Sequence, residues 1–105
     1  MGTGETKIVA DTLRVLQLHG IFCWRNNSGA ARIDGRWVRF GASGSPDIIG
    51  VLPGGRFLGI EVKTATGKES DRQREFRERI ESSGGVAIVV HSTDEMLAKI
   101  KRYMA

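Results

Sequence analysis

Residues 45–63 read SPDIIGVLPGGRFLGIEVK, two β-rich runs on either side of a Pro-Gly-Gly turn, and this stretch decides the fold. Side chains alternate along a strand, so one face of the second run is apolar and carries Leu58, Ile60 and Val62. Glu61 and Lys63 share the other face. We therefore expect a β-hairpin with its apolar face toward the core and its other face charged.

The length of the turn decides whether two carboxylates meet. A three-residue loop over 53–55, with Gly55 in the left-handed conformation, sets Asp47 opposite Glu61, with Cβ atoms about 4.5–5.5 Å apart. Two bare carboxylates at that range repel, so a divalent cation bound through oxygen would keep both ionised. A two-residue loop would place the same side chains on opposite faces and remove the site.

The rest of the chain predicts the order α-β-β-β-β-β-α-β-α. The expected elements are a helix over 5–19 with Thr3 as a possible N-cap, a strand over 21–25, a hairpin of 31–33 and 36–40 around Asp34-Gly35, a helix over 70–83, a strand over 86–90 buried on both faces, and a last helix with a Ser92–Glu95 capping box. In the first helix the apolar positions are Ile8, Val9, Leu13 and Leu16. The helical crossover after Lys63 favours parallel pairing with 86–90, which gives a mixed sheet flanked by helices.

Length and composition limit the possible functions. The 105 residues fit one domain over 1–105. No apolar run is long enough to cross a bilayer and the first residues do not resemble a signal peptide, so we expect a cytoplasmic protein. Cys23 is the only cysteine, which excludes an intramolecular disulfide and a cysteine-based zinc site.

The charge distribution is more informative than the total. The formal net charge is +4, which agrees with an anionic partner without establishing one. Basic side chains lie on both sides of the acidic pair in the sequence: Arg25, Arg32, Arg36 and Arg39 before it, and Lys68, Arg72, Arg74, Arg77 and Arg79 after it. A small acidic site within a basic surround is the arrangement expected where phosphates approach carboxylates that hold a cation.

These residues carry a resemblance to a known family. Pro46, Asp47, Glu61 and Lys63 resemble the motif of the PD-(D/E)xK nuclease superfamily. With the 25–29 segment before them and the Gln73-bearing helix after them, nearly the whole chain resembles the stand-alone virus-type replication-repair nuclease (VRR-NUC) domains of phages and bacteria. The resemblance implies an α/β, restriction-endonuclease-like fold with a mixed central sheet, and a metal-dependent DNA endonuclease that hydrolyses phosphodiester bonds.

The resemblance also assigns site residues. Asp47 and Glu61 would hold Mg²⁺ or Mn²⁺, with the backbone carbonyl of Val62 as a further ligand and Glu5 completing the shell. Lys63 would orient the attacking water or stabilise charge on the phosphoryl oxygens. Glu5 has an alternative role, because a glutamate in the first turn of a helix also complements the helix dipole.

Several polar residues keep two interpretations. Gln73 either forms a capping box with Ser70 or reaches into the active site. The residues that could contact nucleic acid are Arg25, Asn26, Asn27, Ser45, Lys68 and Arg72, of which the first four could equally form polar turns. Trp24 and Trp37 are better suited to a core or an interface than to base stacking.

The expected partner is DNA, and the resemblance implies branched or four-way-junction DNA cut by a homodimer. Such a dimer would use the apolar and aromatic hairpin around Trp37 and Phe40. The alternative function is a nucleic-acid-binding module that keeps the fold without the reaction.

Overall fold

The structure is a computed structural model that describes residues 4–104. Its elements are α1 (Gly4–Leu18), β1 (Phe22–Arg25), β2 (Gly29–Ile33), β3 (Arg36–Phe40), β4 (Ile48–Leu52), β5 (Arg56–Val62), α2 (Asp71–Ser82), β6 (Val86–Val90), α3 (Thr93–Ile100) and the 3₁₀ turn η1 (Lys101–Tyr103). The predicted order of helices and strands is confirmed, and η1 adds one turn after the last helix. The predicted N-cap Thr3 lies outside the described residues.

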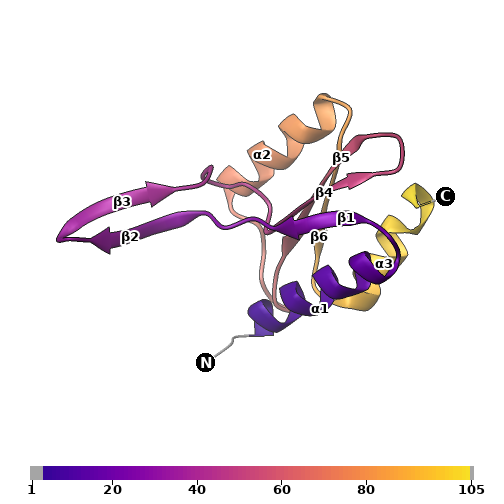
Figure 1. Cartoon of the computed structure of the whole chain (residues 1–105), viewed down its shortest axis with the longest axis horizontal. Coiled ribbons are helices and arrows are strands. Elements are labelled where there is room, and N and C mark those ends of the chain that lie inside the picture. Colours follow the sequence, from indigo (N-terminus) through magenta and orange to yellow (C-terminus); the bar gives the residue numbers. More distant parts are fainter. Residues whose placement is uncertain (1–3, 105) are drawn as a thin grey trace.

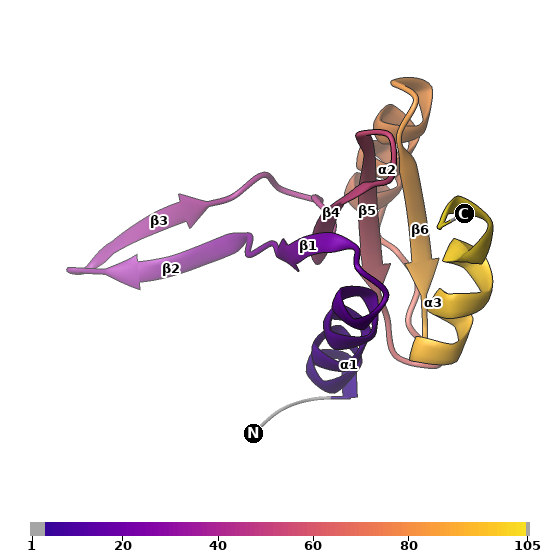
Figure 2. The ribbon, with the colours of Figure 1, turned by 45° about the vertical axis from the view of Figure 1, so that its right-hand side comes forward.

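The central sheet is mixed, as predicted, with the strand order β1-β4-β5-β6. The pairs β1–β4 and β4–β5 are antiparallel, whereas β5 and β6 are parallel because α2 carries the chain back between them. The strands β2 and β3 form a separate two-stranded sheet that projects away from the rest of the molecule (Figures 1 and 2).

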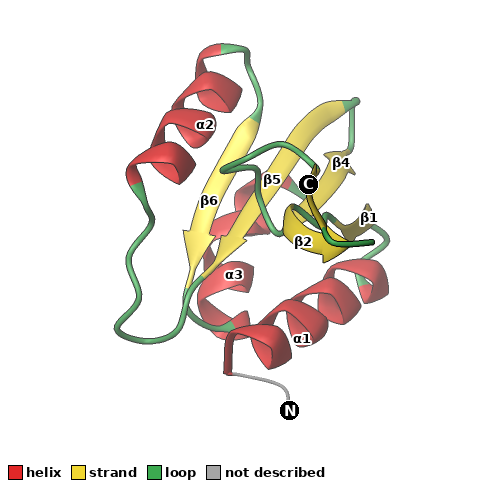
Figure 3. Cartoon of the chain, turned by 90° about the vertical axis from the view of Figure 1, so that its left-hand side faces the viewer, coloured by secondary structure: helices red, strands yellow, loops and turns green. Residues whose placement is uncertain are grey.

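Helices cover both faces of the central sheet (Figure 3). The apolar face of β5 is fully buried, as predicted, and joins side chains of α1 and α3 in one core: Val9, Leu16, Leu58, Ile60, Val62, Met96 and Ile100. On the other face Gly59 lies against Pro46 and α2. A Cβ on Gly59 would be 2.6 Å from Pro46 and 3.2 Å from Ile80 of α2. No helix within residues 4–104 is long and apolar enough to cross a membrane.

Two details of the predicted elements are corrected. The strand β6 is not buried along its whole length, because it is an edge strand: Val86 and Val90 are buried and the three residues between them are half-buried. The last helix has only half of its predicted capping box. The Ser92 hydroxyl accepts from the Glu95 N–H, but the Glu95 carboxylate accepts from the His91 N–H instead of returning to the cap residue.

The projecting hairpin limits which side chains of the predicted interface share one surface, and the interface itself stays a prediction. Trp37 pairs with Arg32 across the two strands, and Phe40 pairs with Gly29. Directly paired residues share a face, and residues three apart along a strand point to opposite faces. Trp37 and Phe40 therefore lie on opposite faces, and a flat interface on this hairpin contains only one of them.

Candidate active site

The turn between β4 and β5 takes the three-residue form that builds the acidic site. Leu52 pairs with Arg56, and Gly55 has a φ of 85°, as predicted for its left-handed position. The register runs back to the pair Ile48–Ile60, so Asp47 and Glu61 are the next residues on their two chains. The alternative two-residue register is excluded.

Asp47 is held by backbone hydrogen bonds on both its side chain and its main chain. Its Oδ2 accepts from the Val62 N–H at 2.7 Å, next to Glu61. Its carbonyl oxygen accepts from the Asn26 N–H at 2.8 Å, at the end of β1. A carboxylate fixed in this way has little rotamer freedom left to lose when a ligand binds.

Asn26 organises the segment before Asp47. Its Nδ2 donates to the Ser45 hydroxyl at 2.8 Å and to the Pro46 carbonyl at 2.9 Å, so both side-chain amide hydrogens have partners. Ser45 itself is buried. The structure thus gives both residues a positioning role, whereas Arg25 and Asn27 are exposed beside them. Nucleic-acid contact by these four residues stays a prediction.

Gln73 performs both of the roles that the sequence left open. Its backbone N–H donates to the Ser70 hydroxyl at 3.2 Å, and its Oε1 accepts from the Ser70 N–H at 2.8 Å, which completes the capping box of α2. Its Nε2 donates to Glu61 Oε1 at 2.5 Å. The cap fixes the orientation of the amide, and the amide in turn holds the Glu61 carboxylate.

The surroundings of Glu61 disfavour its charged form. The residue is 6% exposed, and burial is the main reason why its pKa rises from 4.5 to about 7. The negative charge of Asp47 raises this pKa further, and Lys63 acts in the opposite direction. Smaller contributions of the same sign as Asp47 come from Glu69 and Glu5. A second positive charge at this point would stabilise the ionised pair.

An ion pair that the sequence did not indicate lies beside Glu61. The Arg77 guanidinium contacts both Glu69 oxygens, with Nη2–Oε1 at 2.7 Å, and its Nη1 donates to Glu81 at 2.8 Å. This pairing lowers the pKa of Glu69. Arg77 also lines a small cavity with Glu61 and Gln73. Its position one helical turn after Gln73, on the same face of α2, is the signal that could have identified it.

Lys63 and Glu5 are the other charged residues predicted at the site. Lys63 directly follows β5, and Glu5 lies on α1. The Lys63 N–H donates to the Val90 carbonyl at 2.9 Å, so the residue directly follows the buried end of β5. Glu5 lies in the first turn of α1, whose first residue, Gly4, adjoins Thr64. Within residues 4–104, however, no three Asp, Glu, His or Cys side chains form a group that could hold a metal ion. Glu5 is therefore not grouped with Asp47 and Glu61 in the metal-free chain, and metal binding by Glu5 stays a prediction.

The donors that are present suit a hard cation. Magnesium is bound in proteins through one or two carboxylates and keeps water and substrate phosphate oxygens as its other ligands. Asp47 and Glu61 supply such a pair, and the pKa of Glu61, raised first by burial and then by the charge of Asp47, reflects an unfavourable ionised state that a cation would stabilise. A ligand role for the Val62 carbonyl stays a prediction.

Comparison with known proteins places the chain in a family. The family model of the VRR-NUC domain matches residues 4–94. The chain belongs to the VRR-NUC domain family. No curated protein matches its sequence. The family gives this VRR-NUC domain a nuclease-type function and a nucleic-acid substrate.

Two solved structures have the same fold. One, described as a VRR_NUC domain, has a TM-score of 0.70 and 23% identity, and the match covers 99% of this chain and 100% of the other. A second, described as a VRR_NUC domain protein, has a TM-score of 0.64 and 18% identity, with 99% and 90% covered. The expected PD-(D/E)xK architecture, a mixed sheet between helices, is confirmed for this VRR-NUC domain.

The predicted phosphate-binding side chains of the VRR-NUC domain lie at the surface. Lys68 and Arg72 are exposed on the segment that leads into α2 and on its first turn. The loop before Asp47 packs against this turn, since a Cβ on Gly44 would lie 2.7 Å from the Arg72 carbonyl oxygen. Arg72 therefore lies beside the loop that leads to Asp47, and contact of Lys68 and Arg72 with nucleic acid stays a prediction.

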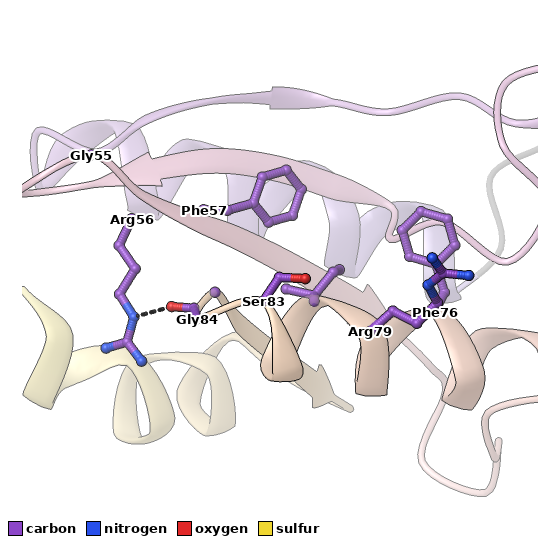
Figure 4. A pocket seen from close by; sticks show the side chains of 9 residues that line it. Gly55, Arg56, Phe57, Phe76, Arg79, Ser83 and Gly84 are labelled. Atoms are coloured by element: carbon purple, nitrogen blue, oxygen red, sulfur yellow. Dashed lines mark hydrogen bonds between the residues drawn. The ribbon is translucent and has the colours of Figure 1, made fainter.

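A larger cavity of the VRR-NUC domain lies elsewhere. A groove of about 800 Å³ runs between the start of β5 and the end of α2 (Figure 4), with Arg56, Phe57, Phe76, Arg79 and Ile80 among its lining residues. The Arg56 Nε donates to the Gly84 carbonyl at 2.8 Å across one end of it. The groove has no carboxylate among its lining residues, so it is not the acidic site.

Proposed function

We propose that this VRR-NUC domain is a metal-dependent DNA endonuclease that hydrolyses phosphodiester bonds with Mg²⁺ or Mn²⁺. The observation that carries the proposal is the buried Glu61 carboxylate beside Asp47, held by Gln73 and shifted to a pKa of about 7. Carboxylates with strongly raised pKa values cluster at functional sites, so this unfavourable pair supports a site that binds a cation. When bound, the divalent ion supplies positive charge that offsets the phosphate and makes water more acidic.

The chain's own residues account for the remaining steps. The Asp47 Oδ2 accepts from the Val62 N–H, and its other oxygen would bind the ion. Gln73 keeps the Glu61 carboxylate in one orientation. The Lys63 ammonium, which follows β5 directly, orients the attacking water or stabilises the charge that develops on the phosphoryl oxygens.

The proposed substrate is branched DNA, cut by a homodimer. One chain has a single set of Asp47, Glu61 and Lys63, so two coordinated cuts in symmetry-related strands require a second copy. The exposed apolar side chains of the projecting hairpin, Ile33, Val38 and Phe40, share one of its faces and form the interface of this proposal.

Cleavage of a substrate panel tests the activity. Single-stranded, duplex, flap, fork and four-way DNA are incubated with Mg²⁺ or Mn²⁺, and Asp47→Asn is compared with Asp94→Asn, an exposed aspartate at the start of α3. We expect cleavage by the wild type and the control and none by Asp47→Asn. Wild-type rates in Asp47→Asn at saturating metal would place the chemistry elsewhere.

Calorimetry with Mg²⁺ or Mn²⁺ in the absence of DNA separates the enzyme from a binding module on the same fold. We expect the wild type to bind the ion and Asp47→Asn to bind it more weakly. A chain that binds DNA but neither binds the ion nor cuts would be the non-catalytic module.

A further inference from the structure

The hairpin of β2 and β3, residues 29–40, has few partners in the chain. The two strands pair with each other and with no strand of the central sheet. They extend the molecule to 48 Å along its longest axis, against 32 and 25 Å along the others (Figures 1 and 2). A two-stranded hairpin is marginally stable alone in water. We call residues 29–40 the arm, and its isolation indicates that it is completed by something outside the chain.

The two faces of the arm differ in chemistry. One face, the apolar face, carries Ile33, Val38 and Phe40, with Arg36 paired to Ile33 at its outer end. The other, the arginine face, carries Arg32 directly across from Trp37 and Arg39 two residues further along. The Arg32 guanidinium lies 5.9 Å from the centre of the Trp37 ring, which is 69% exposed.

The arm starts at the acidic site and is fixed there. The chain enters it from Asn26 and leaves it through the loop that ends at Asp47, and hydrogen bonds of Asn26 join these two segments. At the base of the arm, the segment before β2 contacts the segment after β3. A Cβ on Gly41, whose φ is 70°, would lie 2.5 Å from the Asn27 carbonyl oxygen. A ligand on the arm is therefore held in a defined position relative to Asp47.

We propose that the arm is a nucleic-acid-binding ribbon whose arginine face lies against the backbone of the substrate beside the acidic site. The proposal rests on the nuclease function proposed above and names a contact surface for its substrate. Guanidinium groups bind phosphates with paired hydrogen bonds, and an exposed tryptophan offers a surface for a base or sugar. The arginine face has two arginines, Arg32 and Arg39, and the whole arm has three arginines against one acidic residue, Asp34.

The dimensions of the arm suit a duplex. A two-stranded ribbon enters the major groove of DNA. Five residues of strand span about 17 Å at 3.4 Å per residue, which corresponds to about five base pairs of rise. The arm would thus contact the substrate over about half a helical turn on one side of the cut.

Binding measured without cleavage tests the proposal. Fluorescence anisotropy of a labelled duplex and a labelled four-way junction, in EDTA and over a range of salt, compares the wild type with Arg32→Gln/Arg39→Gln. The matched control is Arg14→Gln/Lys101→Gln, which removes two exposed positive charges from α1 and η1. Each lost phosphate contact should lower the salt slope by about 0.9 and weaken binding about eightfold at 0.1 M salt. We expect this loss in the arm variant and not in the control.

Two further variants separate contact from folding. Arg32→Lys/Arg39→Lys keeps the charge, so it should recover most of the salt slope. Trp24→Phe leaves Trp37 as the single tryptophan, and its emission should change when unlabelled DNA is added.

Each contrary result has a distinct meaning. A chain that binds no nucleic acid at all would contradict the nuclease proposal as well as the arm. Wild-type affinity and salt slope in Arg32→Gln/Arg39→Gln, or an unchanged Trp37 emission at saturating DNA, would overturn the arm alone. Binding lost only in step with dissociation of a dimer would make the arginine face a contact between copies, which also overturns the proposal.

Discussion

Ionising Glu61 in the folded chain lowers the free energy of unfolding, and this loss depends measurably on pH. The pKa of Glu61 in the folded, metal-free chain is about 7 against an ordinary 4.5. Below about pH 4.5 the residue is protonated in both the folded and the unfolded chain. Between pH 4.5 and about 7, Glu61 is ionised in the unfolded chain but still largely protonated in the folded chain. Folding stability therefore falls as pH rises through this range and levels off above the folded pKa. The full loss is about 3 kcal/mol at about 1.4 kcal/mol per unit of pKa.

The variant Glu61→Gln should remove this loss, because an amide of the same shape does not ionise. We expect the metal-free variant to unfold at a higher temperature than the wild type at pH 8 and to differ less from it at pH 4.5. Mg²⁺ should stabilise the wild type at pH 8 and not the variant, which should also fail to cut DNA. Thermal unfolding at the two pH values checks this, with the exposed Glu78→Gln as control. Equal pH dependence in the wild type and Glu61→Gln would contradict the raised pKa.

Lys63 should affect catalysis more than metal binding. Lys63→Ala removes an ammonium group assigned to water or phosphate, so single-turnover cleavage should slow about 10²–10³-fold. Because the Lys63 charge lowers the pKa of Glu61, its removal should also move the rising limb of the pH–rate profile to higher pH. Lys101→Ala, which removes an exposed lysine on η1, is the matched control. A pH–rate profile that keeps its midpoint would remove Lys63 from the electrostatics of the site.

At the scale of secondary-structure elements, α1 contains a polar group that its apolar pattern did not indicate. Thr12 is fully buried with Val9 and Leu16, and its hydroxyl has no hydrogen-bond partner among the described residues. The predicted face of α1 included Ile8 and Leu13 instead, which are half-buried. A helix that packs against both a sheet and another helix buries one stripe of side chains. The spacing of apolar residues in the sequence places that stripe only to within about one residue.

Replacing this hydroxyl should stabilise the protein. Thr12→Val has nearly the same shape and removes an unsatisfied buried group, so we expect a gain of about 1 kcal/mol in the free energy of unfolding. Thr12→Ser, which keeps the hydroxyl and loses the methyl group, should destabilise. Denaturant unfolding of both variants decides the matter. A loss of stability in Thr12→Val would mean that the hydroxyl has a partner, such as a buried water.

The elements that sequence predicts best are those whose signals are local. The β4–β5 hairpin was predictable, with two possible registers, because the Pro-Gly-Gly turn sits inside it. The α2 cap was predictable because Ser70 and Gln73 are three residues apart. The separation of β2 and β3 from the main sheet was not predictable, because an alternating strand does not identify its neighbours.

The candidate site divides in the same way. Asp47 and Glu61 meet across a turn of known geometry, which sequence reasoning can follow. The contacts of Asn26 with Ser45 and Pro46 join residues about twenty positions apart, and those of Arg77 with Glu69 depend on how α2 is placed on the sheet. Such contacts follow from the assembled fold, so the positioning role of Asn26 and the pairing of Arg77 with Glu69 could not be read from the pattern.

For the molecule as a whole, the opposite faces of the arm make assembly and DNA binding separable. We expect a dimer at micromolar protein concentration, and we expect Phe40→Glu to shift it toward monomer, because the change puts a charge on the apolar face. Trp37→Ala, on the arginine face, should leave the dimer intact. Sedimentation of the three proteins, with cleavage of a junction labelled on each strand in turn, measures both properties. A wild-type monomer that nicks only one junction strand would exclude the dimer and leave the nuclease assignment standing.

The short loop between β4 and β5 also bears on the order of events during folding. Asp47 and Glu61 belong to one local hairpin, and such hairpins form in about 1–10 μs, whereas parallel pairing of β5 with β6 requires closure of the whole α2 segment. The two carboxylates therefore meet early, before Gln73 and Lys63 take their final places, and their repulsion opposes the first steps toward the native state. A divalent ion present at that stage should speed refolding as well as slow unfolding, so the ion would help the chain to fold in addition to its proposed role in the reaction.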